Sequence, residues 1–259
     1  MSDSTLEGRR IWLTGASSGI GAALAQELAL RGARLALTAR RREPLEAFAA
    51  AHPGTLVVPG DVSDREAMLA VGRAIDAAWG GLDLAIFNAG TYRPVTPDTF
   101  HADIFREHFD VNVMGTVHGI EAVLPGMRSR RSGRIAVVAS VTGFAALPMA
   151  SAYGATKAFL ISMCDSLRAD LNGSGVAITV IAPGFVTTPL TAQNDFDMPF
   201  EITANEAAKV IAEGLASGDD EIAFPKRMAF AMKFLGALPG PLRRAYVARI
   251  ARRRAKPTR

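Results

Sequence analysis

The sequence predicts a single α/β domain in which helices cover both faces of a doubly wound parallel sheet. Over the first 190 residues, short apolar or β-branched runs alternate with helical stretches, which is typical of βαβ units. A glycine-rich turn at 14–21 separates the first apolar run from the first helical stretch, a position that favours ligand binding in such sheets. With 259 residues, 49% of them hydrophobic, the chain can bury a large core.

The expected elements alternate between strand and helix along the chain. We predict strands at 10–14, 34–38, 55–58, 82–88, 133–140 and 177–181, and an edge strand at 221–224. Helices fit between them at 20–31, 44–51, 64–78, 100–127 and 152–171. Right-handed crossovers then place ligands at the carboxyl ends of the strands. Because no repeat or linker interrupts the chain before residue 225, we assign 1–225 to one domain and 226–259 to a basic, apolar extension.

The composition argues against several classes of protein. Cys164 is the only cysteine, so the chain cannot form an internal disulfide, and this suits a reducing compartment. The first residues lack the basic-then-apolar pattern of a signal peptide, and no run reaches the roughly 18 apolar residues that a membrane span needs. The four histidines lack metal-ligand spacing. We therefore expect a cytoplasmic protein without a metal site.

The turn after the first strand is a candidate phosphate-binding loop. Its glycines allow a sharp turn and a close approach to a pyrophosphate, and the helix that begins there offers free N–H groups and a positive dipole. The order G-x-x-x-G-x-G differs from the commoner G-x-G-x-x-G, and a plain strand-to-helix connection would also use glycines. Its place in the first βα unit favours nucleotide binding. The predicted ligands are Gly15, Ser17, Ser18, Gly19, Ile20 and Gly21.

The end of the second strand indicates which nucleotide the site would bind. A site for NAD(H) carries a carboxylate about 20 residues after the turn, where it binds the ribose 2′-hydroxyl. Ala39 stands at that position and Arg40 follows it. A guanidinium suits a 2′-phosphate, although the arginines could also form a solvated cluster at a helix entry. The sequence favours NADP(H) over NAD(H), with Arg40 as a ligand.

A second group of residues points to proton transfer. Tyr153 and Lys157 lie four residues apart in a predicted helix and therefore share a face. A phenol with a pKa of about 10 exchanges protons poorly at neutral pH, and a neighbouring ammonium would lower that pKa. Ser140, at the end of the preceding strand, would reach the same crevice and could hydrogen-bond a carbonyl oxygen. A Tyr-x-x-x-Lys pair alone is a weak indication, because solvated helices carry it by chance.

The nucleotide-binding positions resemble those of the classical short-chain dehydrogenase/reductase family over about residues 8–225. The turn at 14–21 is similar to the family's TGxxxGxG motif. The resemblance implies a Rossmann-like fold, a residue pair that contacts adenine, an NAG motif after the fourth strand, and a PG motif whose threonine holds the nicotinamide carboxamide. These positions are Asp61, Val62, Asn88, Ala89, Gly90, Pro183, Gly184 and Thr188.

The reacting positions resemble the catalytic tetrad of the same family, with Asn112, Ser140, Tyr153 and Lys157 in the family's order. The resemblance implies hydride transfer between a nicotinamide and a carbonyl or secondary alcohol. Ser140 and Tyr153 would contact the substrate. Tyr153 would give a proton to the substrate oxygen, or take one from it. Lys157 would lower the pKa of Tyr153 and bind the nicotinamide ribose, so Tyr153 and Lys157 also count as cofactor ligands. Asn112 would hold Lys157 and a relay water.

The resemblance also implies a substrate lid and an oligomer. The lid would span about 190–206, where Phe196, Met198 and Phe200 indicate either a hydrophobic substrate or a loop that buries its own aromatic rings. Copies of the chain would associate, as homodimers or homotetramers, through the helix that carries Tyr153 and the helix before it.

The extension at 226–259 makes the net charge of the chain positive. It holds 11 of the 29 Lys and Arg residues and no acidic ones, so the first 224 residues have 18 basic against 25 acidic groups, a net charge of −7. Apolar residues nearly surround its first helical stretch, which its own domain, a second subunit or a lipid surface must cover. We expect the end, 252–259, to be disordered and predict no nucleic-acid partner. Two alternatives stay open: a reductase peripheral to a membrane, and a non-catalytic NADP(H)-sensing protein.

Overall fold

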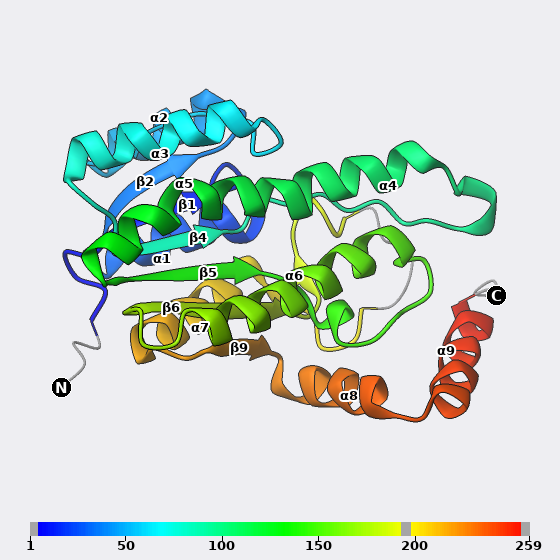
Figure 1. Cartoon of the computed structure of the whole chain (residues 1–259). Helices are drawn as coiled ribbons and strands as arrows, with labels where there is room; N and C mark the ends of the chain where they lie inside the picture. The colour runs from blue at the N-terminus through cyan, green and yellow to red at the C-terminus, as the bar shows by residue number, and fades with distance from the viewer. Residues whose placement is uncertain (1–4, 193–197, 255–259) are drawn as a thin grey trace.

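A seven-stranded parallel sheet forms the centre of the protein (Figure 1). The computed structural model describes residues 5–192 and 198–254. The strand order is β3-β2-β1-β4-β5-β6-β9. The strands are β1 (Arg10–Thr14), β2 (Arg34–Thr38), β3 (Leu56–Val57), β4 (Leu84–Phe87), β5 (Gly133–Val138), β6 (Val176–Pro183) and β9 (Glu221–Phe224). Every pair in this sheet is parallel. The predicted doubly wound α/β fold is confirmed, and its strand order reverses between β1 and β4.

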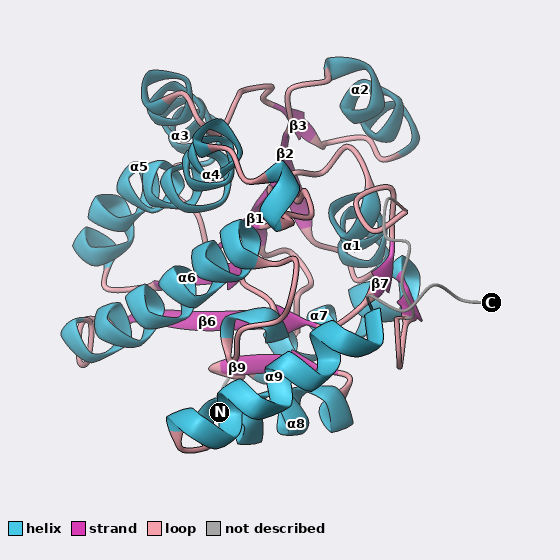
Figure 2. Cartoon of the chain, turned by 90° about the vertical axis from the view of Figure 1, so that its right-hand side faces the viewer, coloured by secondary structure: helices cyan, strands magenta, loops and turns pink. Residues whose placement is uncertain are grey.

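Helices cover both faces of the sheet because successive strand residues point to opposite sides. Ile11 and Leu13 of β1 pack into one core with α1 (Gly19–Leu30), α2 (Arg42–Ala51) and α7 (Ala204–Ser217). Trp12 points the other way, into a core with α3 (Arg65–Trp79), α5 (Gly115–Arg130) and α6 (Ser151–Asp170). Figure 2 shows α3, α5 and α6 on one side of the strands and α1 and α2 on the other.

The predicted helix at 100–127 is more complex in the structure. A 3₁₀ turn, η1 (Pro97–Thr99), precedes α4 (Ala102–His108), and a π-helical turn, η2 (Phe109–Met114), joins α4 to α5. The π turn carries Asn112, which is buried. Hydrophobic periodicity cannot reveal a π turn, because the turn adds only one residue to a continuous helical pattern.

Short elements surround the end of β6. The predicted strand at 133–140 ends early, and Ser140 caps the 3₁₀ turn η3 (Val141–Gly143). A small parallel pair, β7 (Val186–Thr187) with β8 (Ile202–Thr203), brackets the segment predicted as the lid. Thr203 and Glu206 form a capping box that starts α7.

The C-terminal extension forms two helices, α8 (Lys226–Ala237) and α9 (Gly240–Arg254). One face of α8 is buried, with Met228, Met232 and Leu235 packed against Val141 and Ala145 of the same domain. The rest of the fold therefore covers part of the apolar surface of α8, for which the sequence analysis left three possible partners open. The predicted disorder from residue 252 is wrong for Arg252–Arg254, which continue α9, while 255–259 lies outside the described residues. Within 5–192 and 198–254, no helix is long and apolar enough to span a membrane.

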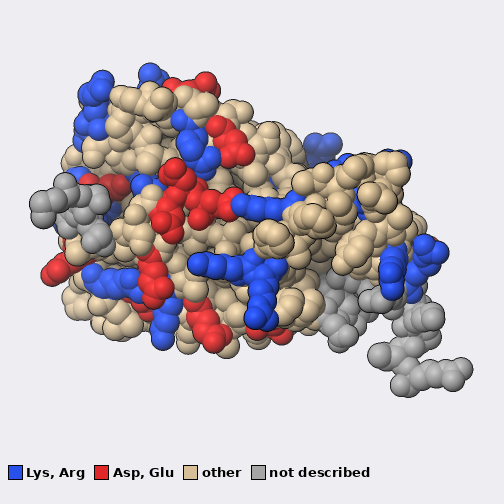
Figure 3. All heavy atoms as spheres, turned by 90° about the horizontal axis from the view of Figure 1, so that it is seen from below, with Lys and Arg blue, Asp and Glu red and all other residues tan. Residues whose placement is uncertain are grey.

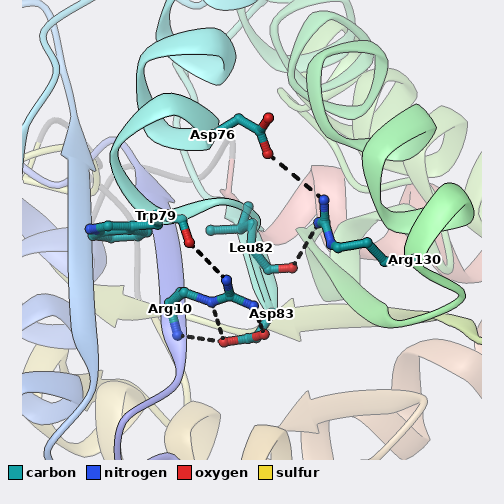
Figure 4. Close-up of polar contacts among 6 residues, drawn as sticks. All are labelled: Arg10, Asp76, Trp79, Leu82, Asp83 and Arg130. Atoms are coloured by element: carbon teal, nitrogen blue, oxygen red, sulfur yellow. Dashed lines mark hydrogen bonds and ion pairs between the residues drawn. The ribbon is translucent and has the colours of Figure 1, made fainter.

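A charged network ties the amino ends of β1 and β4 together, at the edge opposite the glycine-rich turn (Figure 4). Arg10 donates from Nε and Nη2 to the two carboxylate oxygens of Asp83, at 3.0 and 2.6 Å. The backbone N–H of Arg10 donates to the same carboxylate at 2.8 Å, and Nη1 donates to the Trp79 carbonyl at 3.0 Å. Burial raises the pKa of Asp83, but the hydrogen bonds and charge of Arg10 outweigh it and hold that pKa below its ordinary value.

We expect Asp83→Asn to lower the free energy of unfolding by about 1–2 kcal/mol, because it leaves the Arg10 guanidinium without its charged partner. The measurement is urea denaturation at neutral pH. Glu46→Gln is the matched control, since Glu46 pairs with Arg42 at 3.3 Å in solvent and should change stability by less than about 0.5 kcal/mol. If both variants lose the same free energy of unfolding, the network stabilises the protein no more than a surface ion pair does.

Candidate active site

A cleft of about 720 Å³ opens at the carboxyl ends of the strands, beside the reversal between β1 and β4. Ligands bind at such reversals in doubly wound sheets. All the residues predicted to bind a cofactor line this one cleft: Gly15, Ser17, Ser18, Gly19, Ile20, Gly21, Arg40, Asp61, Val62, Asn88, Ala89, Gly90, Tyr153, Lys157, Pro183, Gly184 and Thr188. Segments far apart in the sequence are thus brought together, although their binding roles stay predictions.

The 14–21 turn packs so tightly that it requires glycine. Gly15 has a φ of +69°, and a Cβ on it would lie 2.8 Å from the Ala89 Cα. A Cβ on Gly21 would lie 2.1 Å from the Gly15 carbonyl oxygen. The Thr14 hydroxyl accepts hydrogen bonds from the backbone N–H groups of Asn88 and Ala89 at 3.1 and 3.2 Å. The two loops therefore form one floor of the cleft, with no room for a side chain between them.

The start of α1 is suited to an anion. In the described structure, the side chain of the N-cap residue, Ser18, makes no capping hydrogen bond, and the first turn of α1 carries no acidic residue. The N–H groups and positive dipole at this helix end therefore face the cleft without a competing carboxylate. A pyrophosphate fits this floor and this helix end.

Two arginines stand where the sequence analysis placed a 2′-phosphate. Ala39 is buried at the end of β2, and Arg40 and Arg41 line the cleft. Arg41 donates from Nη2 to the Ser17 carbonyl at 3.2 Å, so its guanidinium lies over the glycine-rich turn. The sequence analysis named only Arg40 as a ligand. Its neighbour belongs to the same basic run, but only the fold shows that it bends back onto the turn.

Asp61 keeps its negative charge at the adjoining wall. Burial raises the pKa of this carboxyl, but hydrogen bonds from Ser63 and the charge of Arg40 lower it further, to below its ordinary value. Its Oδ1 accepts from the Ser63 N–H at 2.9 Å and from the Ser63 hydroxyl at 2.7 Å. The carboxylate is held in place and lies within the field of Arg40.

Tyr153 stands where the cleft meets a second, smaller pocket, and it lines both. Burial raises the pKa of Tyr153 to about 12, while a hydrogen bond with Ser140 acts in the opposite direction. Ser140 in turn donates to the Pro183 carbonyl at 3.2 Å. The phenol is thus a half-buried, protonated group at neutral pH, held beside a serine hydroxyl.

Lys157 lies near Tyr153 but hydrogen-bonds elsewhere. Its Nζ donates to the Val138 carbonyl at 2.8 Å and lies 5.4 Å from the centre of the Tyr153 ring. Burial lowers the pKa of Lys157 to about 8, and burial is the largest influence on the pKa of Tyr153. The expected effect of the lysine on the tyrosine pKa stays a prediction.

Asn112 is buried beside these residues, but its partners differ from those expected. Its Oδ1 accepts from the Thr91 N–H at 2.7 Å, and its Nδ2 donates to the Thr91 carbonyl at 3.0 Å and to the Thr156 hydroxyl at 3.1 Å. Within the described part of the chain, Asn112 has no direct hydrogen bond to Lys157. It pins the loop after Gly90 to α6 and so positions the lysine through the helix.

The smaller pocket, about 70 Å³, has a mostly apolar wall beside Ser140 and Tyr153. The ring of Tyr92 meets that of Tyr153 edge-on, with centroids 5.1 Å apart. Further wall residues are Val141, Thr142, Leu147, Pro148, Ala150, Gly184, Phe185, Leu190, Thr191 and Met228. The sequence analysis missed Tyr92, Phe185 and Met228, because no local pattern marks them.

The predicted apolar mouth of the lid is only partly described. Phe196 lies outside the described residues, and Phe200 is 56% exposed and does not line the pocket. From the predicted lid, Leu190 and Thr191 line the pocket, and the rest of its wall comes from the loops after β4, β5 and β6 and from α8. Among the described residues, no group of three or more His, Cys, Asp and Glu could hold a metal ion.

Residues 9–198 match the short chain dehydrogenase family, and the chain belongs to that family. An uncharacterized oxidoreductase of Myxococcus xanthus is 41% identical over 238 residues, which cover 90% of this chain and 94% of the relative. An uncharacterized oxidoreductase of Staphylococcus epidermidis is 33% identical over 204 residues, or 78% of this chain and 89% of the relative. The protein is therefore an oxidoreductase of this family.

Two solved structures share the fold. A short-chain dehydrogenase from Streptomyces avermitilis superposes with a TM-score of 0.77 at 25% identity, covering 95% of this chain and 98% of the other. L-sorbose reductase from Gluconobacter frateurii, in complex with NADPH and L-sorbose, has a TM-score of 0.75 at 26% identity, covering 85% of this chain and 96% of the reductase.

The lowered pKa of Lys157 predicts a pH-dependent stability. Between about pH 8 and its unfolded value of 10.5, the unfolded chain binds a proton that the folded chain has released. Stability from this group is therefore gained as pH rises and lost as pH falls through about 8. From pH 7 to pH 10, the wild type should gain about 2–3 kcal/mol of unfolding free energy relative to Lys157→Met.

Urea denaturation of both proteins at the two pH values measures this difference. Lys209→Met is the control, because Lys209 is exposed on α7 and should give no such pH-dependent difference. If the difference in unfolding free energy between the wild type and Lys157→Met is the same at both pH values, the pKa of Lys157 is not lowered in the folded protein.

Proposed function

We propose that the protein transfers a hydride between NADP(H) and a carbonyl or secondary alcohol of a hydrophobic substrate. The main support for this proposal is the position of Tyr153, which lines both the cleft and the apolar pocket beside it. A cofactor in the cleft and a substrate in the pocket would meet at its hydroxyl. The nicotinamide, when bound, supplies the hydride chemistry, and the protein supplies binding, orientation and the proton.

Tyr153 is the proton donor for the carbonyl oxygen in the direction of reduction. Its raised pKa keeps the phenol protonated at neutral pH, as a donor must be. Ser140 shares the hydrogen bond with Tyr153 and orients the substrate oxygen. Lys157 lies one helical turn away, and its ammonium stabilises the phenolate that proton donation leaves behind. Ser140, Tyr153 and Lys157 lie around the junction of the cleft and the pocket, with Asn112 buried beside them, and this grouping supports catalysis rather than NADP(H) sensing.

Arg40 and Arg41 support NADP(H) as the cofactor. Both line the cleft near the glycine-rich turn, and the buried Ala39 leaves no carboxylate at the end of β2. A guanidinium pairs with a phosphate through charge-assisted hydrogen bonds, and a ribose hydroxyl offers it little. The NADPH in the related L-sorbose reductase agrees with this assignment.

Copies of the chain should associate through α5 and α6. Phe109, on the π turn η2 that leads into α5, and Phe159 of α6 are both 43% exposed and meet edge-on, with centroids 6.0 Å apart. A second copy would cover these rings. The unpaired, buried Cys164 suits the reducing cytoplasm as the site of action.

Tyr153→Phe tests the reaction. It removes the proton donor without changing the ring, so kcat/KM for NADPH oxidation with a responsive ketone or aldehyde should fall by roughly 10²–10⁴. Binding of NADPH, followed by its fluorescence, should persist. Tyr246→Phe, on the exposed side of α9, is the matched control and should retain full activity. Full turnover by the Tyr153 variant would refute the mechanism.

Arg40→Ala and Arg41→Ala test the cofactor. Each should weaken the binding of NADPH by about 1.5–3 kcal/mol, for a lost charge-assisted contact, and leave that of NADH nearly unchanged. Titration calorimetry measures both affinities. Arg42→Ala is the control, because Arg42 pairs with Glu46 and does not line the cleft. Equal losses for the two nucleotides would contradict the choice of NADP(H).

A further inference from the structure

The outer face of α8 carries apolar side chains that the domain leaves uncovered. Phe230 is 75% exposed and Phe234 is 60% exposed. They lie four residues apart, with Arg227 one turn before Phe230, so all three share one stripe of the helix. The opposite face holds the buried residues Met228 and Met232. The helix is therefore apolar on both sides, and only the inner side has a partner within the domain.

A second stripe of the same kind follows on α9. Leu242 is 59% exposed and Tyr246 is 53% exposed, and Arg249 continues their stripe one turn later. Val247, on another side of α9, is half-buried against the core that holds Met228. Because α8 ends at Ala237 and α9 begins at Gly240, both stripes belong to the same end of the molecule (Figure 1).

The surroundings of these stripes are strongly basic. The described side chains of α8 and α9 include seven Lys and Arg and no Asp or Glu. Of these seven, only Lys233 has an acidic partner within the described structure, Glu221. Figure 3 shows blue and tan atoms, and no red ones, at the end of the molecule that carries α9. The charge is thus available to an anionic partner.

The same helix connects this surface to the substrate pocket. Met228 lines the pocket beside Tyr153 and Ser140, while Phe230 and Phe234 project from the other side of α8. A partner bound to the outer face would therefore lie one helix diameter from the pocket.

We propose that α8 and α9 dock on an anionic lipid surface through Arg227, Phe230, Phe234, Leu242, Tyr246 and Arg249. Helices with aromatic and aliphatic side chains on one side and Lys or Arg around them lie in the plane of the lipid headgroups. Arginine stems extend along apolar surface while their charges reach the phosphates. This docking would bring lipophilic carbonyl compounds to the pocket, and only that consequence rests on the proposed function.

A second copy of the chain is the competing occupant, because residues 1–224 carry a net charge of −7. The arrangement favours lipid. Its arginines are spread over two helices with no acidic residue among them, which suits a plane of mobile headgroups. A protein partner would have to bury these charges in fixed pairs, which is costly unless each pair has good geometry.

Vesicle sedimentation of the full chain tests the proposal. Phosphatidylcholine vesicles that contain phosphatidylserine should bind the protein, and vesicles of phosphatidylcholine alone should bind it far less. Phe230→Ala with Phe234→Ala should lower the partition coefficient at least about tenfold, because both rings lose their burial in lipid. Arg227→Gln with Arg249→Gln should reduce the preference for the anionic vesicles.

Phe100→Ala is the matched control, since Phe100 is 65% exposed beside α4, away from this surface, and should bind as the wild type does. All variants should keep the same turnover of a small water-soluble carbonyl compound, which separates this test from that of the reaction. The proposal is overturned if the wild type does not sediment, or if the double phenylalanine variant binds equally well. It is also overturned if neither the wild type nor the variant binds the vesicles and light scattering shows a dimer for the wild type and a monomer for the double phenylalanine variant.

Discussion

The close contact between the 14–21 turn and the loop after β4 is the constraint on which the site depends. It lies where the strand order reverses, and the Thr14 hydroxyl joins the two loops by accepting from the Asn88 and Ala89 N–H groups. A side chain at Gly15 or Gly21 would separate them. Because this contact sets the floor of the cleft, it also sets where α1 points its N–H groups and how far Arg40 and Arg41 stand from them.

Burial of charge is the second organising feature. Lys157 is buried and Tyr153 is half-buried, and burial moves their pKa values in opposite directions, each toward the neutral form. Such sites cost stability and occur where chemistry needs them. Asn112 and Ser140 keep the pair in register by fixing the Thr91 loop and the Pro183 carbonyl. In the proposed reaction, Tyr153 would give up its proton with the charge of Lys157 close by.

The first helix of the C-terminal extension packs into the rest of the fold. It supplies Met228 to the smaller pocket and packs against Val141 and Ala145 beside η3. One helix therefore shapes the pocket on its inner face and presents Phe230 and Phe234 on its outer face. Substrate selection and surface attachment would share a single structural element.

Local features of the sequence determined much of this protein. Strand and helix order and the requirement for glycine at Gly15 and Gly21 follow from spacing and side-chain type, which depend on near neighbours. The expected tetrad of Asn112, Ser140, Tyr153 and Lys157 came from the resemblance to the family. Only the tertiary structure decided that Arg41 bends onto the turn, that Lys157 bonds to the Val138 carbonyl, and that Tyr92 and Met228 line the pocket. These outcomes depend on which distant segments meet and on how deeply each group is buried, and no local pattern encodes either.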